Sequence, residues 1–307
     1  MKVLITGATG LVGKKLVKQL TDDGIEVNYL TQSKSLSIPE TNLIKGFYWD
    51  VKQGKIDKNA LNQVDAVIHL AGATVSKRWT PRYQKEIMDS RVESAKLILK
   101  VLSKNTEHKV KHFITASGIS IYPNSSKDQY NEFSTSIGEN YLAEVVQEWE
   151  KAADAFKILN IKVAKIRTGL VLDAKEGAFP IMKKSIDNYL GASFGNGKQI
   201  FSWIHIDDLI GIYKFVLNHN LEGVYNAVAS NPKSCNEFIK ILGSVLKKPI
   251  LLPNVPAIFL NIALGQMSSL LLEGQYVLND KILASGYQFK FNFLDKAFEA
   301  ILIKNER

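Results

Sequence analysis

Short apolar runs alternate along the chain with longer stretches in which apolar residues recur every three or four positions. The short runs are rich in β-branched and aromatic residues and predict strands, whereas the longer spacing predicts helices with one buried face. The predicted strands are KVLITG (2–7), EVNYLT (26–31), DAVIHLAG (65–72), KHFITAS (111–117) and KVAKIRTGLVL (162–172). Strands that alternate with helices predict an α/β fold, a doubly wound parallel sheet with helices on both faces.

The pattern loosens after about residue 170, where glycines cluster before FSWIHIDDL and GVYNAVA resume a strand-like pattern. We predict a nucleotide-binding domain over 1–169, to which 201–229 returns, and a smaller interwoven substrate-binding region over 170–200 and 230–307. The most apolar long run, 255–272, is interrupted by Asn261, Gly265 and Gln266. It therefore predicts a buried amphipathic helix rather than a membrane span.

Composition narrows the class of protein. The chain has 307 residues, of which 46% are hydrophobic and 22% charged, which indicates a globular protein that we expect in the cytoplasm. The N-terminus runs straight into a strand without the features of an export signal. A single cysteine, Cys235, excludes an internal disulfide and is expected to be buried or next to a helix cap. The net charge of +9 is dispersed, so it argues against nucleic-acid binding while favouring phosphate-bearing ligands.

The strongest chemical signal is TGATGLVG, which follows the first predicted strand. Gly7, Gly10 and Gly13 are three positions apart, a spacing that lets the backbone turn tightly and approach a pyrophosphate at the start of a helix. With a strand before it and a helix after it, this motif predicts a Rossmann-type dinucleotide site. The cofactor-binding residues that we predict are Gly7, Thr9, Gly10, Leu11, Val12, Gly13, Thr31, Gln32, Lys34, Asp50, Leu70, Ala71, Gly72, Arg91 and Arg167.

The end of the second strand bears on which dinucleotide is bound. A cofactor without a 2′-phosphate is usually held there by a carboxylate, but this chain has LTQSKS. Gln32 and Lys34 can hydrogen-bond to a 2′-phosphate, so NADP(H) is preferred and NAD(H) is the alternative. Lys34 has a second interpretation, as a solvated surface residue without a ligand. Asp50 would reach the adenine or else serve as a turn residue or helix cap, and Ala71 and Gly72 would meet the ribose.

These motifs give the chain a resemblance to a known family. TGATGLVG, DAVIHLAGATVSKRWTPRYQKEIMDSRVES, YLAEVVQEWEKAA, IRTGLVL, FSWIHIDDL, GVYNAVA and the tail LLPNVPAIFLNIALGQMSSLLLEGQYVL occur in the order of the extended short-chain dehydrogenases/reductases. The chain resembles most closely their atypical branch, the sugar-nucleotide epimerase family. The resemblance implies the fold and an NADP-type cofactor, leaves the substrate open and allows a homodimer.

The wider superfamily uses a tyrosine, a lysine four residues later, a serine and an asparagine. Ser117 matches the serine and Tyr141 the tyrosine, but Val145 replaces the lysine and Arg91 the asparagine. Without the lysine, a tyrosine with a pKa near 10 is a poor base at neutral pH. The related branch also lacks the pair, which favours packing over catalysis for Tyr141. Tyr122, in SIYP, is an alternative acid or a loop aromatic that covers the cofactor.

Other polar residues have two interpretations each. Arg91 would contact the pyrophosphate, the ribose or an acidic substrate, or else pair with Glu86 or Glu93 on its own helix. His205 would act as an acid or base, but its neighbours favour a strand that enters a helix capped by Asp207 or Asp208.

The segment KRWTPRY is a candidate substrate loop. Trp79 would line a substrate pocket, whereas Trp149 and Trp203 are expected in the core. The basic residues of this loop would hold a phosphate or carboxylate or would simply be solvated, and they are Lys77, Arg78 and Arg82.

Two functional hypotheses follow. The first is an NADP(H)-dependent oxidoreductase or epimerase-like enzyme acting on a carbonyl or nucleotide-sugar substrate, in which Ser117 polarises the carbonyl and Tyr122 or Tyr141 donates the proton. It predicts that turnover is lost on Ser117→Ala. The second is a regulatory or scaffold protein that binds NADP(H) without catalysis, which the missing lysine favours.

Overall fold

The protein is built around one large, mostly parallel sheet. The computed structural model describes residues 1–33 and 38–305. The sheet has eight strands in the order β12-β8-β6-β5-β1-β2-β3-β4, and only β4 runs antiparallel to its neighbour. Its strands are β1 (Lys2–Thr6), β2 (Glu26–Thr31), β3 (Ile44–Asp50), β4 (Lys55–Ile56), β5 (Ala66–His69), β6 (His112–Gly118), β8 (Lys162–Thr168) and β12 (Gly223–Ala227). The predicted doubly wound α/β fold is confirmed.

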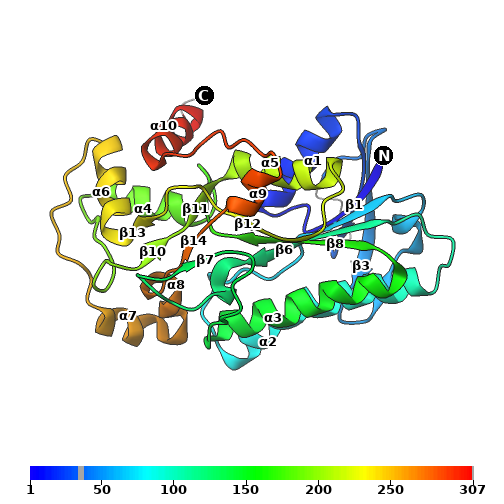
Figure 1. The fold of residues 1–307 in the computed structure, drawn as a ribbon, viewed down its shortest axis with the longest axis horizontal. Helices are drawn as coiled ribbons and strands as arrows, with labels where there is room; N and C mark the ends of the chain where they lie inside the picture. The colour runs from blue at the N-terminus through cyan, green and yellow to red at the C-terminus, as the bar shows by residue number, and fades with distance from the viewer. Residues whose placement is uncertain (34–37, 306–307) are drawn as a thin grey trace.

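Helices cover both faces of this sheet (Figure 1). On one face lie α1 (Leu11–Asp22) and α5 (Ile206–Asn218), and on the other lie α2 (Pro81–Ser103) and α3 (Tyr141–Asp154). In β1, Val3 and Ile5 pack into the core with α1 and α5, whereas Leu4 packs into the core with α2 and α3. Because both faces are covered, the strand is apolar at successive positions instead of alternating with polar ones.

A smaller region is formed mainly by segments after β8 and lies beside the sheet in Figure 1. Its helices are α4 (Ala178–Asp187), α6 (Cys235–Val245), α7 (Ala257–Leu264), α8 (Ser269–Leu272) and α10 (Leu294–Asn305). Helix α9 (Asp280–Ala284) instead packs on the main sheet, where Ile282 belongs to the same core as α1 and α5. Short strands link the smaller region to the main sheet: β7 (Gln129–Tyr130), β9 (Leu170–Leu172), β10 (Ile200–Phe201), β11 (Trp203–His205), β13 (Lys233–Ser234) and β14 (Tyr276–Val277). Trp203 and Cys235 are fully buried in its core, as the sequence predicted.

Two predicted elements differ in the structure. The run 162–172 is broken at Gly169, where an added Cβ would lie 2.2 Å from the carbonyl oxygen of Ser202, so β8 and β9 belong to different sheets. The predicted buried helix over 255–272 is wrong. It is split into α7, a 3₁₀ turn and α8, and α7 contains no buried residue; Phe259 is 62% exposed.

The error in this segment has a physical source. Apolar residues surround α7 on all sides, so the sequence gives it no single apolar stripe that would select a buried face. Gly265 then takes a left-handed conformation, with a φ of +57°, that ends the helix. Of the helices over the described residues, none combines the length and apolarity that crossing a membrane requires.

Candidate functional site

The glycine loop joins β1 to α1 and packs against the end of β5. Gly7 has a φ of +69°, and a Cβ there would lie 2.6 Å from the carbonyl oxygen of Leu70. A Cβ on Gly13 would lie 2.2 Å from the carbonyl oxygen of Gly7. Both contacts are shorter than real Cβ atoms tolerate, so the protein's own packing requires glycine at these two positions.

Gly10 differs from the other two glycines. A Cβ there would meet only the carbonyl oxygen of Gly7, at 3.4 Å, and the backbone is extended. Helix α1 starts immediately after it without a side-chain cap, and the amides of Leu11, Val12 and Gly13 have no acceptor among the described residues. Three free N–H groups and the positive end of the helix dipole make this a site for an anion such as a pyrophosphate.

The ends of β2 and β3 lie next to this loop in the sheet order. The hydroxyl of Thr31 accepts a hydrogen bond from the amide of Ser33 at 3.1 Å, and Gln32 is exposed. Asp50 accepts one from the amide of Gln53 at 3.0 Å, which is the turn role that the sequence left open. Lys34 lies outside the described residues.

The end of β5 is tied to the glycine loop from the other side. The hydroxyl of Thr6 accepts hydrogen bonds from the amides of Leu70 and Ala71, at 3.1 and 3.0 Å. A Cβ on Gly72 would lie 2.9 Å from the guanidinium carbon of Arg91. The predicted cofactor residues of β1 and β5 are therefore adjacent, and Arg91 lies against the backbone that follows β5.

Arg91 lacks the helix ion pair that the sequence offered as an alternative. Its Nη1 donates to the carbonyl oxygens of Ala73 and Ile87, at 3.1 and 2.9 Å, and its guanidinium lies 4.9 Å from the ring centroid of Trp149. Within the described ranges it has no carboxylate partner, and Glu93 pairs with Lys96 instead. Burial lowers the pKa of Arg91 to about 10, so it stays charged at neutral pH.

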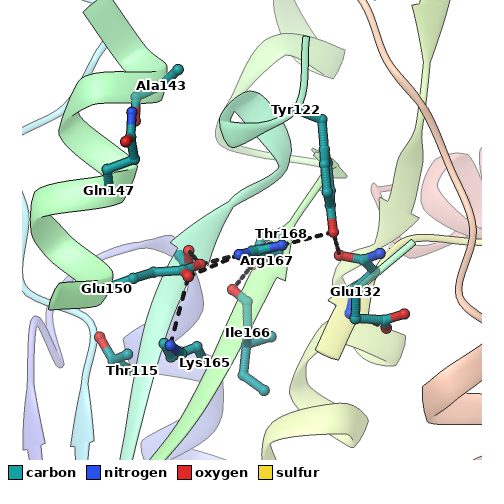
Figure 2. Close-up of polar contacts among 12 residues, drawn as sticks. Thr115, Tyr122, Glu132, Ala143, Gln147, Glu150, Lys165, Ile166, Arg167 and Thr168 are labelled. Atoms are coloured by element: carbon teal, nitrogen blue, oxygen red, sulfur yellow. Dashed lines mark hydrogen bonds and ion pairs between the residues drawn. The ribbon is translucent and has the colours of Figure 1, made fainter. Parts of the chain in front are cut away.

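Arg167 meets the buried carboxylate of Glu150 (Figure 2), and Ser117 contacts the same carboxylate. The Ser117 hydroxyl donates to Glu150 Oε1 at 2.7 Å. Arg167 donates to both oxygens of Glu150, at 2.8 and 2.9 Å, and Lys165 lies 3.8 Å from Oε2. The side chains of Arg167 and Glu150 are each 9% exposed. The catalytic role of Ser117 and the cofactor role of Arg167 stay predictions, and in this arrangement both side chains are engaged with Glu150.

Tyr122 belongs to the same buried network, as Figure 2 shows. Its hydroxyl accepts a hydrogen bond from Arg167 Nη1 and donates one to Asn226 Oδ1, both at 2.9 Å. The side chain is 1% exposed, and burial raises its pKa. With both partners inside the protein, the Tyr122 hydroxyl joins β8 to β12 in this structure, and its catalytic role stays a prediction.

Tyr141 has a different environment, at the first position of α3. Its hydroxyl donates to the carbonyl oxygen of Gln84 on α2 at 2.5 Å, and its ring meets the edge of Trp79 at a centroid distance of 5.3 Å. Burial raises the pKa of Tyr141 to about 12, and the charge of Arg91 opposes that rise. Val145, in the place of the lysine, is 2% exposed and packs in the protein.

A cavity of about 570 Å³ opens beside Tyr141. Two hydrogen bonds hold its walls together: Gln84 Nε2 donates to Gln266 Oε1 at 2.7 Å, and Asn140 Nδ2 donates to Glu273 Oε2 at 2.5 Å. Trp79 lines the cavity, in agreement with the sequence. The full lining is Trp79, Glu139, Asn140, Tyr141, Asn261, Gly265, Gln266, Ser268, Ser269, Leu272 and Glu273.

Sequence reasoning missed most of this lining. Asn140 alone carried a local signal, because an asparagine before a helical run is a typical N-cap, and its side chain does accept from the amide of Ala143 at 2.8 Å. Glu139, Gln266 and Glu273 have no such signal, since they meet only when the C-terminal segment folds against α2 and α3.

His205 is the N-cap of α5, a role that the sequence analysis assigned to Asp207 or Asp208. Its Nδ1 accepts from the amide of Asp207 at 3.1 Å, so the histidine itself caps α5. Asp208, predicted as a possible cap, is fully buried and accepts from the amides of Lys290 and Phe291, at 2.8 and 3.0 Å. The caps were misassigned because these contacts to residues 290 and 291 are distant in sequence.

Comparison with known proteins decides the family. Residues 3–228 match the model of the NAD-dependent epimerase/dehydratase family, and residues 255–301 match a domain of unknown function. This chain belongs to the NAD-dependent epimerase/dehydratase family. The resemblance drawn from the seven sequence motifs is thereby confirmed.

Similar proteins span almost the whole chain. An epimerase family protein of Staphylococcus epidermidis is 36% identical, covering 98% of this chain and 99% of that protein. A chloroplastic epimerase family SDR39U1 homologue of Arabidopsis thaliana is also 36% identical, covering 98% of this chain and 87% of its own.

The solved structures agree with this placement. Human epimerase family protein SDR39U1, solved with NADPH, has a TM-score of 0.85 and 31% identity over 98% of this chain and 99% of its own. A nucleoside-diphosphate sugar epimerase of Corynebacterium glutamicum has a TM-score of 0.78 and 28% identity, covering 98% of this chain and 58% of that chain. The family, the fold and NAD(P) binding follow from these matches.

Proposed function

We propose that this family member is an NADP(H)-dependent oxidoreductase or epimerase-like enzyme that acts on a carbonyl compound. The observation that carries the proposal is the uncapped start of α1, where Gly10 leaves room for a pyrophosphate in front of free amides. Preference for NADP(H) is supported by Gln32 at the end of β2, where a carboxylate would favour NAD(H), and by the NADPH in the human relative.

Tyr141 is the proton donor in this proposal. A phenol with its pKa at about 12 keeps its proton at neutral pH, which suits an acid that protonates a carbonyl oxygen. When bound, NADPH would supply a hydride for the carbonyl carbon and become NADP⁺. Tyr141 would give its proton to the carbonyl oxygen, which makes the alcohol, and the resulting tyrosinate would regain a proton from water. Ser117 and Tyr122 are assigned to the buried network around Glu150 in this proposal, because their hydroxyls donate to Glu150 and to Asn226.

Arg91 supplies the cation that the absent lysine would provide. It is charged, it has no carboxylate partner among the described residues, and its charge opposes the rise in the pKa of Tyr141. An anion formed at the Tyr141 oxygen after proton transfer would be stabilised by this nearby positive charge. Arg91 thus acts through Tyr141 as a positioning residue.

The decisive experiment is a titration of the protein with NADPH and NADH, followed by stopped-flow nicotinamide absorbance against aldehydes, ketones and nucleotide sugars. We expect NADPH to bind more tightly than NADH and to be oxidised by at least one carbonyl compound. Absence of NADPH binding would refute the cofactor site at the glycine loop. NADPH binding without oxidation across the panel would refute catalysis.

The role of Arg91 has its own test. Arg91→Met removes the charge but keeps a long apolar side chain, so we expect kcat to fall by about tenfold to a hundredfold, while KM for the carbonyl changes little. Arg91→Lys, which restores the charge, should recover part of the loss. If Lys and Met variants lose activity equally, the charge of Arg91 is not what the reaction uses.

A second candidate function is supported by one observation. The Tyr141 hydroxyl is bonded to a backbone carbonyl and Val145 is packed in the core, so the usual Tyr-x-x-x-Lys machinery is absent. A non-catalytic protein that binds NADP(H) to stabilise one conformation would need only the glycine loop. The stopped-flow experiment separates the two, because such a protein binds NADPH without oxidising it.

A further inference from the structure

The charged side chains that line the cavity beside Tyr141 are acidic. Among its lining residues are two carboxylates, Glu139 and Glu273, and no lysine, arginine or histidine. Glu139 has no hydrogen-bond or ion-pair partner among the described residues, and it is exposed. The cavity wall therefore presents negative charge that no cation of the described lining neutralises.

Glu273 has an oxygen available to a ligand. Its Oε2 accepts from Asn140 Nδ2, whereas Oε1 has no partner in the described part of the chain. The bond to Asn140 fixes the carboxylate beside the start of α3, where Tyr141 is the next residue. A hydroxyl or ammonium group of a ligand can donate to Oε1 without breaking any protein contact.

Two amides add donors to the same wall. Gln266 uses its oxygen to accept from Gln84, and Asn261 uses its oxygen to accept from Ser268 Oγ at 2.6 Å. The NH₂ groups of both amides have no acceptor among the residues described. Neutral donors and charged acceptors together suit a ligand rich in hydroxyl groups, or one with an amine, and Trp79 adds an apolar surface.

The basic residues nearby in sequence do not line this cavity. Lys77 lies over the ring of Tyr83, 5.7 Å from its centroid, and Arg78 and Arg82 are exposed outside the lining. Arg91 is not among the lining residues, and its Nη1 donates to the backbone carbonyls of Ala73 and Ile87. A diphosphate in the cavity would meet two carboxylates without the arginine or lysine contacts that such groups require.

We propose that this cavity binds a small, uncharged or cationic carbonyl compound with hydroxyl or amino groups, and that it rejects phosphorylated and nucleoside-diphosphate substrates. This inference rests on the proposed NADPH-dependent reduction and narrows its substrate class. It replaces the anionic or phosphorylated substrate that the basic loop suggested. Glu139 and Glu273 are its specificity-determining residues.

A charge series of related ketones tests the proposal on the NADPH-saturated protein. The probes are aminoacetone, dihydroxyacetone and dihydroxyacetone phosphate, which are cationic, neutral and anionic at pH 7. Binding is measured by saturation-transfer NMR, and turnover by NADPH absorbance. We expect affinity to decrease in that order, and the double variant E139Q/E273Q to weaken aminoacetone by about tenfold while improving the phosphate.

The glutamine at 273 keeps an oxygen for Asn140, so the variant removes charge with little change of shape. The matched control is Glu148→Gln on α3, which is outside the lining and should leave the order unchanged. Three outcomes would each overturn the proposal. Dihydroxyacetone phosphate could bind most tightly of the three probes, or the order of affinities could stay the same in E139Q/E273Q. The third is that no probe binds at tens of millimolar. NADPH affinity, measured separately, reports whether the cofactor site itself has failed.

Discussion

A single carboxylate, that of Glu150, neutralises positive charge buried at the centre of the sheet. Glu150, on α3, accepts from Ser117 and Arg167, and Lys165 lies nearby on β8. Its carboxylate is the shared counter-ion of two cations whose side chains are only 9% and 10% exposed. At this scale, Ser117 and Arg167, which the sequence suggested for chemistry, are both engaged with a buried carboxylate, and their roles in catalysis and cofactor binding stay predictions.

Glu150→Gln should therefore destabilise the protein strongly. Glutamine keeps the shape of the side chain but removes the negative charge, leaving Arg167 buried without a counter-ion. Breaking a buried pair in this way costs about 3–5 kcal/mol, measured as the free energy of unfolding in urea. Glu148→Gln, which removes an exposed carboxylate on the same helix, should cost less than about 1 kcal/mol. Equal losses in both variants would contradict a structural role for Glu150.

The first crossover shows how an element becomes a site. Gly7 and Gly13 are required by contacts within the β1–α1 unit and with the end of β5, while Gly10 leaves space in front of α1. The helix provides free amides because no side chain caps it. In this segment Gly7 and Gly13 are needed for packing, whereas Gly10 is needed to leave room for the ligand. Substitutions at these positions can separate the two requirements.

Gly10→Ala and Gly13→Ala form a matched pair. In Gly10→Ala the new methyl group meets only Gly7 at 3.4 Å, so we expect a Tm close to that of the original protein and NADPH affinity lowered by about tenfold or more. In Gly13→Ala the methyl group overlaps backbone at 2.2 Å, so both Tm and affinity should fall. If Gly10→Ala binds NADPH normally, the space before α1 is not where the pyrophosphate lies.

Across the whole molecule, buried histidines link stability to pH. Burial lowers the pKa of His69 to about 3 and that of His112 to about 4, from 6.5 when exposed. The unfolded chain therefore binds more protons than the folded one below pH 6.5, and stability falls as the pH drops from 6.5 toward 4.

Each buried histidine contributes up to about 1.4 kcal/mol per pH unit, so the free energy of unfolding should fall by about 2 kcal/mol between pH 6 and pH 5. Urea unfolding at both pH values measures it. His112→Gln should remove about half of that change. A profile that is flat between pH 7 and pH 5 would contradict this, because it would mean that the folded and unfolded states bind equal numbers of protons over that range.

Sequence alone determined the α/β fold, the β1–α1 glycine loop and the family, because these depend on local spacing: apolar runs, turn glycines and motifs in order. It also placed Trp149 and Trp203 in the core, where they are 8% and 0% exposed. These features are encoded within segments of a few tens of residues, so a linear pattern is enough to predict them.

Only the tertiary structure decided which side chains form hydrogen bonds and ion pairs with one another. Glu150 binds Arg167 across two elements, and Glu273 reaches Asn140 across 133 residues of chain. Helix α7 is exposed because no segment among the described residues buries it. The periodicity of apolar residues predicts the helix or strand to which a residue belongs. It does not predict which residue of a distant element will contact it. The cavity beside Tyr141, its charge and its donors therefore emerged only when α2, α3 and the C-terminal segment were brought together.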